Sequence, residues 1–186
     1  MRPSILLAAV FSTAAVAFAA DTYKVDPVHS GVTFAAHHAG AGYVPGRFNQ
    51  VSGSFALDKD DLTKSTFALA VPVDSIDTNN KKRDEHLKSP DFFNAKQYGT
   101  IEFKSTSVEK VDEHNLKVTG DLTLHGVTKS VVLPVELTGS GEFPAGTTRS
   151  GVRAVFTVKL TDHQIKGMPG AVGDEIKLDV MLEGTK

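Results

Sequence analysis

The sequence has no cysteine among its 186 residues, which excludes disulfides, thiolate metal sites, iron–sulfur clusters and cysteine nucleophiles. It also has little excess charge, because 20 basic and 22 acidic side chains give a formal charge of −2. That balance provides no general surface for binding DNA or RNA. What remains is an ordinary globular composition, with 40% hydrophobic residues, 16 Gly, 8 Pro and 11 Phe. These proportions favour a single turn-rich β domain over a helical bundle.

The first segment has the composition of an export signal. Arg2 precedes an apolar run, and Ala17-Phe18-Ala19 supplies the small-x-small pattern that a signal peptidase reads. The run is shorter than the roughly 20 apolar residues that span a bilayer, and Asp21 follows at once. We therefore expect residues 1–19 to be a cleaved signal peptide. Residues 20–186 should then be one periplasmic domain that is not inserted into the membrane.

Apolar and polar residues alternate with a period of two through most of the remaining chain, which predicts β-strands. The clearest runs are residues 116–124, 152–160 and 175–183; in the second, every even position is apolar. Weaker runs occupy residues 32–37, 48–57, 65–71, 101–108 and 131–137. Short turn sequences separate the runs, among them His125-Gly126, a hairpin turn that should place Gly126 at positive φ. Alternation of this kind is typical of antiparallel sheets, and we count about eight strands.

One polar segment, residues 77–88, lacks the alternation. Asp77, Thr78 or Asn79 could cap a short helix that starts near Asn80. Ser89-Pro90-Asp91 then has the order of a second helical turn, which Phe92-Phe93 would anchor. The simplest assembly is a single antiparallel eight-stranded barrel with a helical excursion near residues 80–93 over one opening. A β-sandwich is the alternative, because alternation alone does not distinguish a closed sheet from two stacked sheets.

A barrel of about eight strands has an interior just wide enough for side chains or for one small ligand. Apolar residues facing a hollow lumen would form a lipid pocket, whereas tight packing would form a solid core. The pattern leaves both possibilities open. An ordinary lipocalin is disfavoured, because that family usually has a Gly-x-Trp motif near the first strand and this chain has no Trp.

A series of short motifs spans the whole of residues 20–186. In order they are Asp26-Pro27-Val28-His29-Ser30, Val32-Thr33-Phe34 with His37, Gly46-x-Phe48, Gly53-x-Phe55, Ser75-Ile76-Asp77-Thr78-Asn79, Arg83-Asp84-x-His86-Leu87, Ser89-x-Asp91-Phe92-Phe93, Ile101-x-Phe103-x-Ser105-Thr106 and Gly120-Asp121-Leu122-Thr123-Leu124-His125-Gly126-Val127-Thr128. Their order and spacing resemble those of the YceI-like family of bacterial envelope proteins.

The resemblance implies a lipocalin-like barrel that binds a polyisoprenoid or similar long-chain lipid in its lumen and that often forms a homodimer. Many members carry an Arg-x-Asp-Phe-Gly-like motif on the penultimate strand; here residues 159–165 read Lys-Leu-Thr-Asp-His-Gln-Ile and lack both Arg and Phe. We expect an exported carrier, storage or sequestering protein for a polyprenyl phosphate, an isoprenoid quinone or a fatty-chain lipid. It should need no cofactor and perform no covalent chemistry.

We expect the ligand to contact residues that alternation or the polar segment would place at the lumen or its mouth. On a helix, Arg83, His86 and Leu87 would share one side, so Arg83 and His86 could meet a head group while Leu87 covers the tail. A structural ion pair of Arg83 is the alternative. The full predicted set is Phe34, Phe67, Leu69, Arg83, His86, Leu87, Phe92, Phe93, Phe103, Val118, Leu122, Leu133, Ala154, Phe156 and Leu178.

Two other functions compete with lipid binding. A stress or structural barrel would have a packed core, and a small hydrolase or cyclase would use His29 as a base with Ser30 and Asp26. Neighbouring strand residues point to opposite faces, so His29 is poorly placed to take the proton of Ser30. There is also no Gly-x-Ser-x-Gly elbow. We expect His29 to bond to the backbone at the start of the barrel, and no histidine spacing predicts a metal site.

Overall fold

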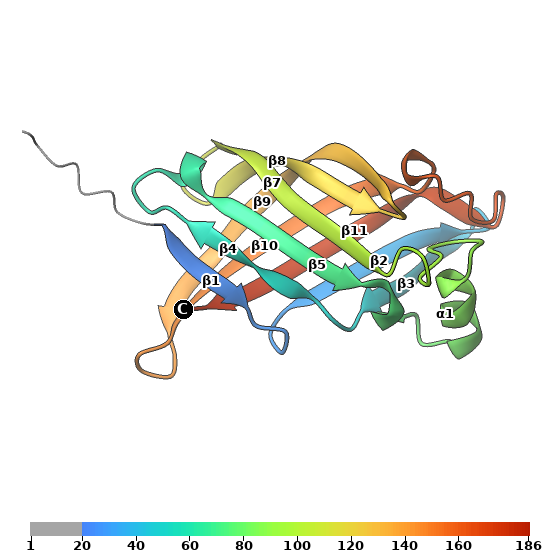
Figure 1. Ribbon diagram of the computed structural model, residues 1–186, viewed down its shortest axis with the longest axis horizontal. Helices are drawn as coiled ribbons and strands as arrows, with labels where there is room; N and C mark the ends of the chain where they lie inside the picture. The colour runs from blue at the N-terminus through green and yellow to red at the C-terminus, as the bar shows by residue number, and fades with distance from the viewer. Residues whose placement is uncertain (1–19) are drawn as a thin grey trace, which may run out of the picture.

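The structure is a computed structural model that describes residues 20–186, so the predicted signal peptide lies outside the described residues. The described chain is all-β, with its strands joined in one sheet that closes on itself (Figure 1). The strands are β1 (Asp21–Val25), β2 (Gly31–His38), β3 (Gly42–Phe48), β4 (Ser52–Leu57), β5 (Thr66–Pro72), β6 (Ile76–Asp77), β7 (Thr100–Lys110), β8 (Asn115–Leu124), β9 (Val127–Glu142), β10 (Thr148–Lys159) and β11 (Val172–Thr185). One α-helix, α1 (Lys81–Lys88), and the 3-10 helices η1 (Leu62–Lys64), η2 (Val73–Ser75) and η3 (Thr161–His163) complete the chain.

The sheet is an antiparallel meander of eight strands, three of which are interrupted. β1 and β2 both pair with β11 and act as one strand broken by a turn. β3 and β4 form a second broken strand, since β3 pairs with β2 and β4 with β1. β5 and β6 form the third, and β7 to β11 follow in order until β11 meets β1. The predicted eight-stranded barrel is confirmed, and the β-sandwich alternative is wrong.

The alternation in the sequence corresponds to the inner and outer faces of the barrel wall. On β10 the even positions from Val152 to Val158 are buried or partly buried, and Ala154 is 8% exposed. Ala154 pairs with Val180 and Phe156 with Leu178 on β11, so apolar side chains meet across the ladder on the inner face. Burial of this face is the main source of stability in a domain that has no disulfide.

The end of the barrel that holds the two termini of the described chain is packed solid. The rings of Tyr23 and Phe55 stack with centroids 5.4 Å apart, and each residue is only 1% exposed. Gly184 makes this packing possible, because a Cβ at that position would come within 2.7 Å of the Tyr23 Cβ. Side chains therefore close the barrel at this end.

Helix α1 covers the opposite end (Figure 1). Asn80 caps the helix, its side chain accepting a hydrogen bond from the backbone N–H of Arg83 at 3.1 Å. Ser89-Pro90-Asp91 does not continue as a second helical turn; the segment forms hydrogen-bonded turns in which the Phe92 N–H donates to the Ser89 carbonyl at 3.1 Å. No described helix has the length and apolar character needed to cross a membrane.

Candidate functional site

The barrel encloses an apolar cavity of about 170 Å³ between the packed end and α1. Side chains from β2, β3, β5 and the strands β7 to β11 line it, and Leu87, Phe92 and Phe93 line it at the α1 end. We call this cavity the lumen. Almost all of its lining residues are aliphatic or aromatic, so it suits an apolar group rather than an ion.

The structure places most of the predicted ligand contacts around the lumen. The predicted residues that line it are Phe34, Phe67, Leu69, Leu87, Phe92, Phe93, Phe103, Leu122, Leu133, Ala154, Phe156 and Leu178. Val118 is completely buried but does not line the lumen. Arg83 and His86 lie outside the lumen, on the exposed side of α1.

Arg83 fastens α1 to the segment before it. Its Nε donates to Thr78 Oγ1 and its Nη2 to the Thr78 carbonyl, both at 2.7 Å. Asp84 accepts from the Thr78 backbone N–H at 2.9 Å and from its hydroxyl at 2.5 Å. Thr78 is only 6% exposed, so this cluster holds the helix over the barrel end through a buried hydroxyl. Arg83 thus has a structural role, through hydrogen bonds to Thr78 rather than through the ion pair that was the alternative.

His86 lies at the edge of the barrel mouth. Its Nε2 is 3.2 Å from Asp91 Oδ2, and its ring meets the Phe92 ring edge-on with centroids 5.1 Å apart. Phe92 is 4% exposed and lines the lumen. His86 therefore contacts the lumen only through Phe92.

Several lining residues were not among those predicted. Phe48, Val71, Ile101, Val131 and Val172 also face the lumen. Phe48 belongs to the Gly46-x-Phe48 motif and its ring packs against Phe93 at 6.2 Å. The period-two pattern would have identified Val131, which is the first inward position of the run 131–137. The period-two pattern did not indicate Val172, because this residue follows a glycine-containing turn.

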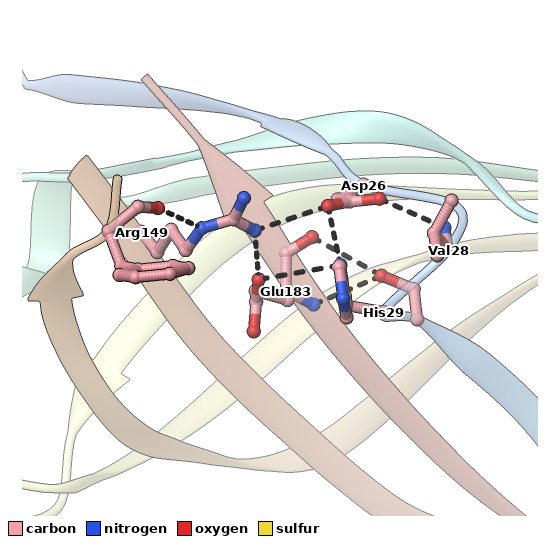
Figure 2. Close-up of polar contacts among 7 residues, drawn as sticks. Asp26, Val28, His29, Arg149 and Glu183 are labelled. Atoms are coloured by element: carbon pink, nitrogen blue, oxygen red, sulfur yellow. Dashed lines mark hydrogen bonds and ion pairs between the residues drawn. The ribbon is translucent and has the colours of Figure 1, made fainter. Parts of the chain in front are cut away.

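A second polar cluster lies where the turn between β1 and β2 meets β10 and β11 (Figure 2). His29 Nδ1 is 2.8 Å from Asp26 Oδ2 and 3.9 Å from Glu183 Oε1. Arg149 Nη1 lies 3.2 Å from Asp26 Oδ2 and also pairs with Glu183 Oε1. The prediction that His29 bonds to the backbone is wrong, because its partners are carboxylates. Arg149 and Glu183 are far from Asp26 in sequence, so no local pattern indicated them.

The two carboxylates of this cluster already share a cationic partner, Arg149. The hydrogen bond from His29, the Val28 backbone N–H and the Arg149 guanidinium together hold the pKa of Asp26 at about 2, well below its ordinary 3.8. Both carboxylates in turn raise the pKa of Arg149. The ligand atoms of Asp26, His29 and Glu183 lie within 4.8 Å of one another, a geometry that could hold a metal ion. A metal would have to displace the Arg149 guanidinium from between the carboxylates.

Ser30, beside the same cluster, hydrogen-bonds to the backbone of β11. Its hydroxyl donates to the Glu183 carbonyl at 3.2 Å and accepts from the Glu183 N–H at 3.0 Å. His29 meanwhile faces the carboxylates, as Figure 2 shows. Ser30 and His29 thus each have other partners, and the arrangement joins β2 to β11 where β1 ends.

The fold and the lumen define a closed antiparallel barrel of the ligand-enclosing kind. The YceI-like domain matches residues 23–184, so the chain belongs to the YceI-like family. It is 38% identical over 191 residues to protein YceI of Escherichia coli, an alignment that covers 100% of this chain and 99% of that relative.

Solved structures share the architecture. BcnA of Burkholderia cenocepacia has a TM-score of 0.77 at 22% identity, over 86% of this chain and 98% of that chain. A polyisoprenoid binding domain from Saccharophagus degradans has a TM-score of 0.68 at 15% identity, over 87% of this chain and 97% of that chain. At these identities the likeness concerns the fold.

Proposed function

We propose that the protein is a periplasmic binding protein that holds the tail of a long-chain isoprenoid, or of a similar amphiphile, in the lumen for transport, storage or sequestration. The observation that carries the proposal is the enclosed apolar lumen. A packed structural barrel has no need of such a cavity, and each empty space in a core reduces stability. The polyisoprenoid binding domain of S. degradans, which shares the fold, supports the choice of ligand class.

The size of the lumen determines how a long tail would bind. Its volume of about 170 Å³ is close to that of an engineered apolar cavity of about 150 Å³ that accepts benzene. Pockets for larger ligands usually measure about 300–1,000 Å³. A long tail therefore enters only if side chains turn aside. The phenylalanines that line the lumen are suited to this, because each can move its ring by changing rotamer while its backbone stays in place.

The energy of such binding comes from the tail. Burying one CH₂ group gains up to about 0.8 kcal/mol. The affinity realised for larger ligands is about 0.3 kcal/mol per atom, because a flexible tail loses entropy when it is ordered. A lumen that contacts only part of a tail therefore still binds usefully. No covalent step or cofactor is needed for this function.

The direct test is mass spectrometry of an organic extract of the protein purified natively from the periplasm. We expect a long-chain amphiphile in stoichiometric amount. An unrelated periplasmic protein, purified in parallel from the same cells, controls for lipid that adheres nonspecifically. An extract no richer in lipid than the control, together with failure to bind added farnesol, would overturn the proposal in favour of a packed structural barrel. Size measurement of the same sample, with and without lipid, tests the homodimer that the family resemblance implies.

A further inference from the structure

A surface pocket of about 570 Å³ adjoins the lumen at the α1 end. It lies between residues 86–92, on α1 and the turn after it, and residues 164–168, which follow η3. We call it the outer pocket. Phe92 lines both the outer pocket and the lumen, so its side chain borders both cavities.

The Phe92 ring is held by contacts that can be released without breaking the barrel. On one side the His86 ring meets it edge-on at 5.1 Å. The ring also lies close to Gly167, where an added Cβ would be 3.2 Å from the Phe92 Cε1. Phe92 belongs to a turn rather than to a strand, so rotation of its ring leaves the sheet hydrogen bonds intact. Gly167 and Gly170, at φ +57° and +84°, lie on either side of the exposed Met168 in the facing loop.

Other routes into the lumen are obstructed. A pocket of about 540 Å³ on the outer face of the barrel also meets two lumen residues, Phe34 and Leu178. Those residues are partners in the β2–β11 ladder, so an opening there would break backbone hydrogen bonds of the wall. The far end is filled by the stacked rings of Tyr23 and Phe55.

We propose that Phe92 is the gate of the lumen and that the outer pocket holds the oxygen-bearing head group of the ligand. This inference rests on the proposed function. A tail that passes Phe92 leaves its polar end in the outer pocket. There Lys166 offers an ammonium group and Gln164 an amide, both on exposed side chains that donate hydrogen bonds. A head group that accepts hydrogen bonds, whether phosphate or hydroxyl, can take them from Lys166 and Gln164. Asp91 also lines this pocket, and its carboxylate, 3.2 Å from His86 Nε2, can accept a hydrogen bond from a hydroxyl.

The absence of cysteine from the sequence allows a direct test by blocking the pocket. Met168→Cys places a thiol on the rim of the outer pocket, and Val28→Cys places one at a site that is 81% exposed in the turn between β1 and β2. Each variant is alkylated with a bulky maleimide, and the binding and release of a fluorescent fatty acid are followed by stopped flow. We expect the Met168→Cys adduct to slow association by roughly tenfold or more and the Val28→Cys adduct to leave it unchanged.

Substitution of the gate provides a second readout. Phe92→Ala should raise both the association and the dissociation rate, because it joins the two cavities. Phe103→Ala, on β7, lines the lumen but neither surface pocket, so it removes only a wall contact and should raise the dissociation rate alone. Phe92→Leu, which keeps an apolar side chain of similar length, serves if the alanine variant does not fold. Lys166→Gln should weaken farnesyl phosphate several-fold more than farnesol; equal effects would identify a neutral head group as the one recognised.

The outcomes separate this inference from the proposed function. One outcome is that the fatty acid binds with rates that are the same in the wild type, the Met168→Cys adduct and the Phe92 variants. That result would overturn the gate and leave lipid binding intact. Slowing by the Val28→Cys adduct to the same extent would place the entrance elsewhere. A wild-type protein that binds no fatty acid, farnesol or farnesyl phosphate would overturn both the proposed function and the gate.

Discussion

The ring of Phe34 lies directly against the backbone of Gly46, its cross-strand partner on β3. A Cβ on Gly46 would come within 2.2 Å of the Phe34 Cζ, closer than any real contact of this kind. The missing side chain of Gly46 therefore leaves space on the inner wall that the Phe34 ring occupies. The position of that ring sets part of the boundary of the lumen.

The first prediction concerns this pair. Gly46→Ala should force the Phe34 ring into the lumen and lower the free energy of unfolding by about 1–3 kcal/mol, as overpacking does. Chemical denaturation measures the loss. Phe34→Leu in the same chain should relieve the clash, so the double variant should be less destabilised than the sum of the two single variants. Additive effects would show that the two positions do not press on each other.

The sequence predicted the regular part of the barrel because alternation records which face is buried. Every even residue from Val152 to Leu160 lines the lumen, as the period-two pattern indicated. The hairpin turn at His125-Gly126 is also confirmed, with φ of 53° and 74°. α1 begins at Lys81, next to the predicted start near Asn80, but its cap is Asn80 and not Asp77, Thr78 or Asn79. These features depend on residues that are close together in sequence.

Other features depend on distant contacts or on shape, and no local pattern reveals them. Arg149 and Asp26 are 123 residues apart, and only the closed sheet brings them together. Arg83 has the residue type and helical spacing of a ligand contact, but the hydroxyl and the backbone carbonyl of Thr78 accept its hydrogen bonds. The volume of the lumen depends on how aromatic rings pack, which alternation does not encode.

The second prediction concerns stability in acid. The depressed pKa of Asp26, about 2 against 3.8, means that the unfolded chain binds this proton first as the pH falls. The contribution of Asp26 to stability is therefore complete above pH 3.8 and is lost as the pH falls through about 2. Asp26→Asn should remove that part of the acid dependence, measured by urea unfolding from about pH 5 to about pH 2. The exposed Asp162→Asn is the control. An unchanged slope in Asp26→Asn would contradict the assignment.

The third prediction concerns the attachment of α1. Thr78→Val removes the hydroxyl that donates to Asp84 at 2.5 Å and accepts from Arg83 Nε at 2.7 Å. Two polar groups lose their partner, so we expect a loss of about 1–3 kcal/mol in the free energy of unfolding. Thr78→Ser keeps the hydroxyl and should retain most of the stability. Equal stability of the two variants would show that the hydroxyl contributes little.

The fourth prediction concerns export. Because Ala17-Phe18-Ala19 has the pattern that signal peptidase recognises, the mature chain should begin at Ala20 and be recovered from the periplasm of a Gram-negative host. N-terminal sequencing and cell fractionation measure both. Recovery of a chain that begins at Met1, or of a membrane-embedded product, would contradict the prediction. Replacing Ala17 and Ala19 with a larger residue should block cleavage.

The last prediction decides between a hollow and a solid barrel at Ala154, which is 8% exposed and faces the lumen from the middle of β10. In a packed core, Ala154→Trp would be severe overpacking and cost about 1–3 kcal/mol or more. A cavity of about 170 Å³ is comparable with one that accepts a benzene ring, so the indole should instead fill the lumen. The variant should then stay within about 1 kcal/mol of the wild type, while bound lipid disappears from the organic extract. Val155→Trp, one residue along and 51% exposed, is the matched control and should retain the lipid. If Ala154→Trp is strongly destabilised and wild-type protein never yields lipid, the interior is packed protein and lipid binding is not the function of this barrel.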